Sequence, residues 1–372
     1  MGGTSMEAAD VAEVRQPLHR ASTLPPRCYT DPAFYALEVE RILRREWLSV
    51  GRAEQVAQPG DYFTIDLLDE PLVVVRDQDN AIRVLSRVCR HRWMPVVEGV
   101  GNRNSFQCPY HLWTYGLDGR LLGAPEMQQA EGFDKAQCRL PTLRSEIWEG
   151  WIFVNFDPQA APLTPQLEPL RRVIAPYRPA DMRATPPLIY DSRWNWKVMV
   201  ENFMESYHHM GSHADTLQPF VPGAGTYADD SDGPYAILHN PAKERTVPLG
   251  LMPPISGLTM EEQTKFIVCA VFPFHLFAVN PDNMVYYQLH PHSVDHFTLR
   301  IFLCVPPAVA ADPAVEHVRG FLDTVHQQDI VACSGVQTGL HSRLATQGRF
   351  SHLEKALWQF NQFVLDRVIS DQ

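Results

Sequence analysis

The segments CRHRWMP (89–95) and CPYHLWTYGLDGRL (108–121) carry the most specific pattern in this chain. Each opens with a cysteine followed two or three residues later by a histidine, and sixteen residues separate the two Cys–His groups. The pattern predicts two tight turns that together form a Cys₂His₂ metal site. Zinc accepts this ligand set, and so does a [2Fe-2S] cluster with two Cys on one iron and two His on the other. The candidate ligands are Cys89, His91, Cys108 and His111.

The order of the ligands favours iron–sulfur over zinc. Cys and His alternate within each segment, whereas common zinc fingers pair Cys with Cys and His with His. The following WTYGLDGRL is predicted to be a strand and turn that cover the cluster. The other five cysteines have no histidine at comparable spacing, and we expect them to be small buried side chains.

The composition is that of a globular protein. The 372 residues are 45% hydrophobic and 20% charged, which suits about two domains of roughly 150 residues. The net charge of −11 argues against nucleic-acid binding. The start of the sequence contains acids and no apolar run, so we expect no signal peptide. The longest apolar run, residues 266–279, is interrupted by Pro273 and is too short to cross a bilayer as a helix. These features predict a cytoplasmic protein with no membrane partner.

The chain is expected to fold as three segments with an α+β architecture. Residues 1–46 carry a helix that packs on the third segment, residues 47–157 form an all-β domain, and residues 158–372 combine an antiparallel sheet with helices. The predicted helices are Asp31–Leu48, 193–209, Ala314–Leu340 and Ser351–Val368, and the predicted long loop is Asp229–Pro254.

A second group of potential metal ligands lies in NWKVMVENFMESYHHMGSHADTLQP (195–219). If this segment is helical, Glu205 and His208 share one face. Two histidine pairs are possible. His208 can join His213 if the helix ends or kinks between them, or His209 can join His213 at the i, i+4 spacing of helical zinc sites. Two histidines with one carboxylate form the facial triad of non-haem Fe(II) oxygenases.

The spacing does not identify the carboxylate. Asp215 is close to His213 but would have to come from the same turn. Asp323 and Asp329 both lie on the helix predicted at Ala314–Leu340. An aspartate on an amphipathic helix is most often a solvated surface charge, so one of these two is expected to be only that.

These segments resemble those of the oxygenase (α) component of Rieske non-haem iron oxygenases, over roughly residues 45–345. CRHRWMP and CPYHLWTYGLDGRL are similar to the cluster segments of that family. The segment around residue 208 is similar to its mononuclear-iron motif, and QQDIVACSGVQTGL (327–340) to the stretch with the last iron ligand. The resemblance implies a [2Fe-2S] Rieske cluster on Cys89, His91, Cys108 and His111, mononuclear Fe(II) on His208, His213 and Asp329, and catalytic roles for Asn202 and Glu205.

Four residues depart from the family pattern. Trp93 and Leu112 stand where the family often has a small residue and add bulk beside the cluster. Gln328 replaces the usual acid before the last ligand, and Ser334 stands where an acid is common.

The resemblance also implies how the parts work together. The catalytic domain is expected to have a helix-grip (START-like) fold, and the protein to be a homotrimer. Glu205 would bridge a cluster histidine of one subunit and an iron histidine of the next. The substrates would be O₂ and a small organic molecule. No G-x-G-x-x-G fingerprint is evident, so we expect a separate flavin or iron–sulfur reductase to deliver electrons from NAD(P)H.

The identity of residue 205 narrows the substrate class. Glu205 stands where ring-hydroxylating dioxygenases typically carry Asp. In this respect the chain resembles the branch of the family that acts on carnitine, choline and glycine betaine. Hydroxylation beside nitrogen there causes N-demethylation or C–N cleavage. Nearby aromatic residues, among them Phe203 and Tyr287, are candidates for a cage around a quaternary ammonium group. The alternatives are hydroxylation or O-demethylation of an aromatic acid and, in other classes, a Rieske electron carrier or a zinc-stabilised binding protein.

Overall fold

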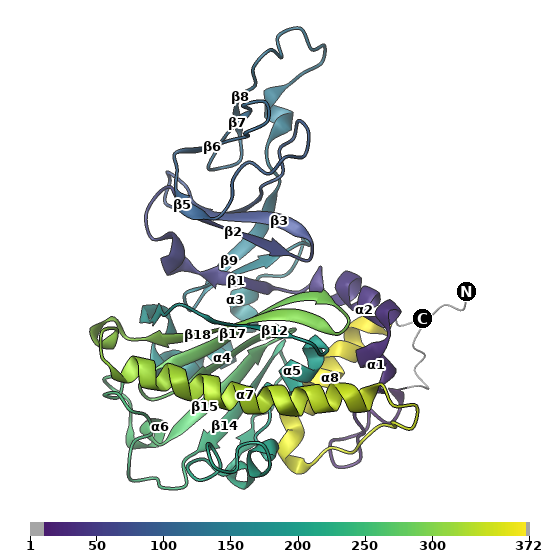
Figure 1. The fold of residues 1–372 in the computed structure, drawn as a ribbon, viewed down its shortest axis with the longest axis vertical. Helices are drawn as coiled ribbons and strands as arrows, with labels where there is room; N and C mark the ends of the chain where they lie inside the picture. The colour runs from purple at the N-terminus through teal and green to yellow at the C-terminus, as the bar shows by residue number, and fades with distance from the viewer. Residues whose placement is uncertain (1–10, 370–372) are drawn as a thin grey trace. The chain divides into compact units, whose positions relative to one another are not determined.

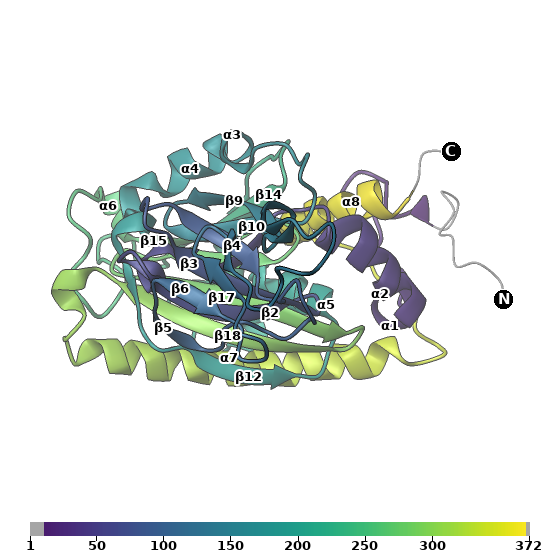
Figure 2. The same ribbon diagram turned by 90° about the horizontal axis from the view of Figure 1, so that it is seen from above.

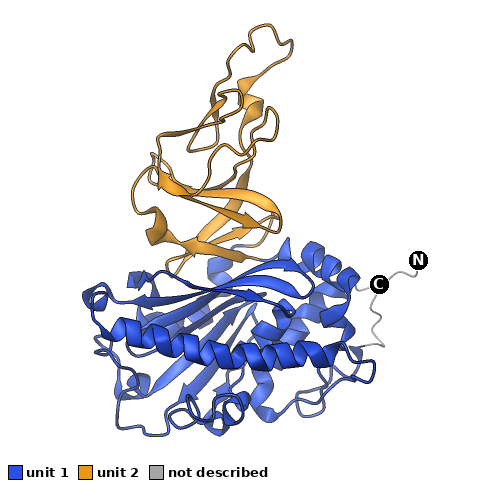
Figure 3. Cartoon of the chain, viewed as in Figure 1, with its two compact units in different colours: residues 1–46, 162–372 blue, residues 47–161 orange. Residues whose placement is uncertain are grey.

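The computed structural model describes residues 11–369 and divides the chain into two compact units (Figure 3). One unit is the continuous segment Trp47–Ala161, and the other combines Met1–Glu46 with Pro162–Gln372. The N-terminal segment therefore folds with the C-terminal half of the chain. Both units contain antiparallel sheets, and helices pack on the sheet of the second, so the predicted α+β class is confirmed.

The unit Trp47–Ala161 contains two antiparallel sheets. The seven-stranded sheet has the order β1-β10-β9-β4-β3-β2-β5, and the three-stranded sheet has the order β6-β7-β8. Its strands are β1 (Leu48–Arg52), β2 (Asp61–Leu67), β3 (Glu70–Arg76), β4 (Ile82–Ser86), β5 (Val100–Asn102), β6 (Ser105–Gln107), β7 (Thr114–Gly116), β8 (Leu121–Gly123), β9 (Thr142–Trp148) and β10 (Trp151–Asn155).

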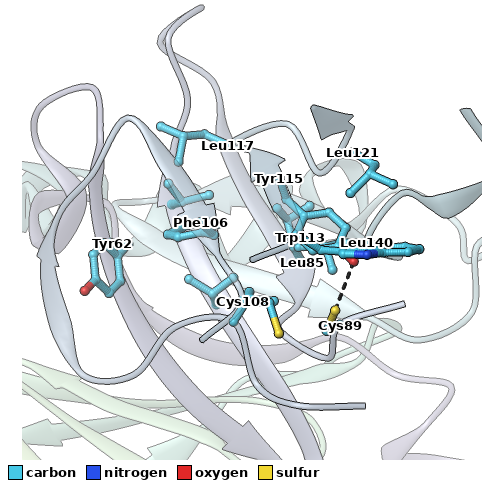
Figure 4. Close-up of a cluster of buried hydrophobic side chains, with 13 residues drawn as sticks. Tyr62, Leu85, Cys89, Phe106, Cys108, Trp113, Tyr115, Leu117, Leu121 and Leu140 are labelled. Carbon is cyan, nitrogen blue, oxygen red and sulfur yellow. Dashed lines mark hydrogen bonds between the residues drawn. The ribbon is translucent and has the colours of Figure 1, made fainter. Parts of the chain in front are cut away.

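The core of this unit contains the two cysteines of the predicted cluster. Phe106, Trp113 and Tyr115 pack with Cys89 and Cys108, and all five are at most 3% exposed. Figure 4 shows both sulfur atoms at one edge of this group of apolar side chains. The short strands β6, β7 and β8 thus support the two Cys–His turns with bulky aromatic rings.

The larger unit is built on an eight-stranded antiparallel sheet. Its order is β11-β18-β17-β16-β15-β14-β13, and β12 also pairs with β18. The strands are β11 (Arg183–Ala184), β12 (Leu188–Ser192), β13 (Tyr227–Ala228), β14 (Tyr235–Pro241), β15 (Lys265–Val271), β16 (His275–Val279), β17 (Met284–Ser293) and β18 (His296–Val305).

Helices cover both faces of this sheet. Figures 1 and 2 show α7 along one face and α4 on the opposite side. The helices are α1 (Arg27–Thr30), α2 (Pro32–Glu38), α3 (Leu163–Gln166), α4 (Glu168–Ile174), α5 (Trp196–Phe203), α6 (Met260–Gln263), α7 (Ala314–Leu340) and α8 (Lys355–Val368). None of the helices within residues 11–369 is both long and apolar enough to cross a membrane.

Several sequence predictions about these elements need correction. The helix predicted at Asp31–Leu48 ends earlier, because α2 passes into a π-helical turn at Val39–Leu43 and Leu48 already pairs in β1. The predicted loop Asp229–Pro254 contains β14, whose seven residues are all buried between β13 and β15. The Gly, Pro and Asp residues on either side of β14 are typical of loops, so the composition of this segment did not indicate a strand. By contrast, α7 has the predicted bounds.

A buried ion pair joins the N-terminal segment to α5. The Nζ atom of Lys197 lies 2.7 Å from a carboxylate oxygen of Glu38, and both side chains are completely buried. The ammonium group also lies 5.1, 5.6 and 5.0 Å from the ring centres of Tyr29, Phe34 and Trp196. Cation–π attraction thus adds to the ion pair. Because α5 leads directly to the second group of predicted ligands, this pair also fixes the start of that segment.

Replacing Lys197 by Met should destabilise the larger unit, because the Glu38 carboxylate is then buried without a cation. We expect the free energy of unfolding to fall by about 3–5 kcal/mol, measured by urea unfolding. The double variant Glu38→Leu/Lys197→Met should recover most of the loss. A single variant that unfolds at the wild-type urea concentration would contradict this role for the pair.

Candidate metal centres

The two Cys–His segments fold into matching turns. In each turn the carbonyl oxygen of the cysteine, Cys89 or Cys108, accepts a hydrogen bond of 3.0 Å from the amide four residues later. Those amides belong to Trp93 and Leu112, whose φ angles are +58° and +60°. Residues with a side chain adopt this left-handed conformation at a cost, which glycine avoids. The turn geometry therefore explains why a small residue suits both positions, and here both side chains point outward and are exposed.

The four predicted cluster ligands lie together at the end of these turns. The rings of His91 and His111 have centres 4.5 Å apart, and Cys89 and Cys108 are each 1% exposed. The Nδ1 atoms of both histidines are buried and form no hydrogen bond within residues 11–369. Burying a nitrogen atom without a hydrogen-bond partner costs free energy of folding, and a bound metal would coordinate both Nδ1 atoms. The donor set therefore fits a Rieske cluster.

Burial and nearby positive groups favour the neutral form of one of these ligands. Desolvation, followed by His111 and Arg92, lowers the pKa of His91. Neutral imidazole is the form that binds metal.

Tyr115 is a further cluster residue that the sequence does not single out. Its hydroxyl group accepts a hydrogen bond of 3.0 Å from the amide of Arg90 and lies 3.2 Å from the sulfur of Cys89 (Figure 4). Because the hydroxyl oxygen already accepts from the amide, its own proton is available to the sulfur. Hydrogen bonds to cluster sulfurs are one of the means by which proteins set cluster potentials. The only signal in the sequence is the position of Tyr115 in the segment expected to cover the cluster.

The second group of predicted ligands is assembled by turns and not by one continuous helix. Helix α5 ends at Phe203, and a 3-10 turn occupies Tyr207–Met210. The Glu205 carboxylate accepts hydrogen bonds from the amide of His208 at 3.0 Å and from its Nδ1 atom at 2.6 Å. The predicted pairing of Glu205 with His208 is present, but the expected helix is wrong at this point.

His213 and Asp329 complete the group. The Nε2 atom of His213 lies 3.0 Å from Oδ1 of Asp329, and that of His208 lies 3.6 Å from the same oxygen. One ligand atom from each of these three residues lies within 4.8 Å of the others. Both Nδ1 atoms are occupied, by Glu205 and by Gln328, so both Nε2 atoms remain available for a metal ion. Two imidazoles and one carboxylate fit mononuclear Fe(II).

The carboxylate of Asp329 favours positive charge on the neighbouring His213. Burial alone lowers the pKa of His213, but the hydrogen bond and charge of Asp329 outweigh it, and the pKa is raised overall. A carboxylate that stabilises a protonated imidazole in this way also stabilises a bound cation.

The alternative ligands lie in other surroundings. His209 is buried, and its Nδ1 atom lies 3.0 Å from the carbonyl oxygen of Val221. Burial lowers the pKa of His209 to about 4. Asp323 accepts a hydrogen bond of 2.6 Å from the hydroxyl of Tyr190, and Asp215 is exposed. None of these three belongs to the group around Asp329 among residues 11–369.

Asn202, predicted to be catalytic, is half-buried near the end of α5. It does not belong to the metal-ligand group around Asp329, whose members are three other residues. Its role stays a prediction.

Aromatic side chains line the region between α7 and the sheet. The ring of Tyr287 lies 4.7 Å from that of Phe203 and 5.8 Å from that of His326. The ring of Tyr190 lies tilted, with its centre 4.4 Å from that of His326, which precedes Asp329 by one helical turn. Tyr286 points to the opposite face of the sheet, because successive residues of a strand alternate. The adjacent tyrosines of β17 therefore lie on two different faces of the sheet.

Comparison with known proteins places both units in one family. A family model for the Rieske [2Fe-2S] domain matches residues 46–143. A model for the ring-hydroxylating alpha subunit, catalytic domain, matches residues 180–370, half of the chain. The chain belongs to the ring-hydroxylating oxygenase alpha-subunit family. The two matched domains imply a Rieske cluster and a mononuclear iron, in agreement with the two donor sets.

Individual members of this family show the extent of the similarity. The carnitine monooxygenase oxygenase subunit of Escherichia coli (strain K12) is 32% identical over 87% of this chain and 85% of its own length. The corresponding subunit of Acinetobacter baumannii is 34% identical over 53% of this chain, a match that spans only about half (55%) of that relative. A solved quaternary ammonium Rieske monooxygenase has the same fold, with a TM-score of 0.85, 24% identity and coverage of 98% and 99% of the two chains.

The assignment of Asp329 can be tested against Asp323, which lies on the same helix. Asp329→Ala should lower the iron content from about three to about two atoms per chain, because the mononuclear site loses its carboxylate while the cluster stays. Iron analysis and the cluster absorbance together measure this. Asp323→Ala is the matched control and should keep all the iron. The reverse result would transfer the ligand role to Asp323.

Proposed function

We propose that this protein is the terminal oxygenase component of a Rieske-type monooxygenase. It uses O₂ and electrons from a separate NAD(P)H-dependent reductase to hydroxylate a small organic substrate. The observation that carries the proposal is the convergence of His208, His213 and Asp329 in a chain that also holds a Cys₂His₂ site. One donor set suits a one-electron relay, and the other suits a metal that activates O₂.

The side chains around these donor sets have separate roles. Cys89, Cys108, His91 and His111 would hold the cluster, and His208, His213 and Asp329 the mononuclear iron. When bound, the two metal groups supply electron transfer and O₂ activation. Glu205 fixes the tautomer of His208 by accepting from Nδ1, so that Nε2 keeps its lone pair. A carboxylate that holds an iron ligand can also reach a cluster ligand of another subunit, which is the proposed bridge.

The best-supported substrate is a methylated or quaternary ammonium compound, with N-demethylation or C–N cleavage. The similarity to carnitine monooxygenase oxygenase subunits supports this class. Phe203 and Tyr287 add aromatic surface on the α7 side of the sheet, which suits a cationic methylammonium group. The aromatic-acid, electron-carrier and zinc-binding alternatives have less support, because the relatives and the catalytic-domain match point elsewhere.

We propose a homotrimer in which the cluster of one subunit serves the iron of the next. Four large side chains around the cluster turns are exposed in the single chain: Trp93, Met94, Tyr110 and Leu112. Exposed apolar side chains gathered at a redox site suit a docking surface. The related quaternary ammonium Rieske monooxygenase transfers electrons between its subunits, which supports the same arrangement for this chain. The reductase would dock on a surface next to these four side chains.

Two further expectations also stay proposals. We propose that the chain is organised as residues 1–46, 47–157 and 158–372, with the first segment packed on the third. The ion pair between Glu38 and Lys197 supports that packing. We also propose a cytoplasmic location, which suits the free cysteines of the described chain.

An anaerobic iron and sulfide assay with a substrate panel tests the proposed activity. We expect about three iron atoms and about two acid-labile sulfides per chain, because a Rieske cluster and one mononuclear iron are present. With a compatible reductase, methylated ammonium compounds should be consumed and simple aromatic acids should not. Zinc alone in a colourless protein would refute the redox function, and turnover of aromatic acids only would refute the substrate class.

Glu205→Ala tests the bridging carboxylate. At saturating Fe(II) this variant should keep both metal sites filled but turn over about 10–100-fold more slowly, because His208 loses the acceptor that orients it. Iron content and steady-state rate are measured on the same sample. Asp215→Ala, which removes an exposed acid nearby, is the control. Wild-type turnover in Glu205→Ala would show that the bridge is not needed.

A further inference from the structure

The second iron histidine is held differently from the first. Gln328 immediately precedes Asp329 on α7, and its Oε1 atom lies 2.7 Å from Nδ1 of His213. The same oxygen accepts a hydrogen bond of 2.8 Å from the hydroxyl of Thr216. One amide oxygen thus serves two donors, which uses both of its lone pairs.

The direction of these hydrogen bonds follows from the metal position. Nε2 of His213 lies 3.0 Å from Asp329 and belongs to the ligand group, so it needs a free lone pair to bind a cation. The proton of the neutral ring must then be on Nδ1, and its partner must be an acceptor. Because Nδ1–H of His213 needs an acceptor, the amide oxygen of Gln328, and not its NH₂ group, faces the ring, and the Thr216 hydroxyl donates to the same oxygen and helps to hold it there.

The two histidines therefore face acceptors of different charge. His208 meets the Glu205 carboxylate at 2.6 Å, whereas His213 meets the neutral amide of Gln328 at 2.7 Å. A carboxylate partner raises the basicity of a ligating imidazole more than an amide does. His213 is consequently the weaker electron donor of the pair.

We propose that Gln328, supported by Thr216, is a positioning residue that fixes the tautomer of His213 and limits its electron donation to the iron. The pairing leaves Glu205–His208 as the carboxylate-backed histidine of the site. A less electron-rich ligand set favours the ferrous over the ferric state, so this arrangement preserves iron in its O₂-reactive form between turnovers. The inference rests on the proposed iron site.

Three variants separate positioning from charge. Gln328→Leu removes the acceptor at similar volume, Gln328→Glu replaces the amide by a carboxylate at nearly the same shape, and Thr216→Val removes the supporting hydroxyl. Gln327→Leu is the matched control, because its neighbouring amide bonds Asp323 and not the ligand group. Two quantities are measured: the Fe(II) dissociation constant against a competing chelator without O₂, and the rate at which the mononuclear iron becomes ferric in air, followed by its high-spin ferric EPR signal.

We expect Gln328→Leu to weaken Fe(II) binding about 10–100-fold and Thr216→Val to weaken it less. Gln328→Glu should bind Fe(II) at least as tightly as the wild type but oxidise several-fold faster in air, an effect that a purely structural role would not produce. Gln327→Leu should match the wild type in both measurements. Equal Fe(II) affinity in Gln328→Leu, or wild-type oxidation in Gln328→Glu, would overturn the proposal.

Two controls keep the outcomes distinct. Far-UV circular dichroism and thermal unfolding report folding of each variant, because the cluster lies in the other compact unit. If Gln328→Leu does not fold, the comparison of Gln328→Glu with Thr216→Val still decides the proposal. A wild-type protein that binds no Fe(II) at this site would refute the proposed function itself. A wild type that binds Fe(II), with unchanged Gln328 variants, would refute only the role of Gln328.

Discussion

The carboxylate of Asp329 lies within reach of two imidazoles from a segment more than a hundred residues earlier, and much of the larger unit serves to hold it there. The 27-residue helix α7 carries Asp329 along one face of the sheet. The turns after α5 bring His208 and His213 to the same place. Two imidazoles and a carboxylate held together with little solvent around them favour a bound cation, so the fold preorganises a metal site.

Both donor sets keep one nitrogen of each histidine for the metal, but by different means. At the mononuclear site, Glu205 and Gln328 occupy the Nδ1 atoms and leave Nε2 available. In the cluster unit the Nδ1 atoms of His91 and His111 are themselves without a partner within residues 11–369, and two matching turns bring the rings together. Neighbouring side chains such as Tyr115 then act on the sulfur atoms. In both units the residues next to the ligands determine the electronic properties of the site as much as the ligands do.

The sequence alone indicated which kinds of ligand each site would use, and the family resemblance was needed to choose among the metals and histidine pairs that spacing left open. Cysteine and histidine residues a few positions apart predict a metal site without knowledge of the rest of the fold, because a tight turn is enough to bring such neighbours together. The helical pattern of the sequence also predicted α7 and its bounds. The helix expected through residues 193–209 was wrong after Phe203, and β14 was hidden among loop-forming residues. Local propensity predicted neither the end of α5 nor strand β14, because packing in the sheet and around the metal ligands overrides it.

Only the tertiary structure decided which distant residues meet. Asp323 and Asp329 occupy the same helix, and spacing alone does not distinguish them, although the resemblance of residues 327–340 to the family implied Asp329. Their separation of six residues turns their side chains to different neighbours, so Asp323 bonds Tyr190 and Asp329 lies beside His213. The contact of Gln328 with His213 likewise depends on the packing of α7 against a turn 115 residues away along the chain. Such long-range pairings follow from the fold as a whole and not from any local pattern.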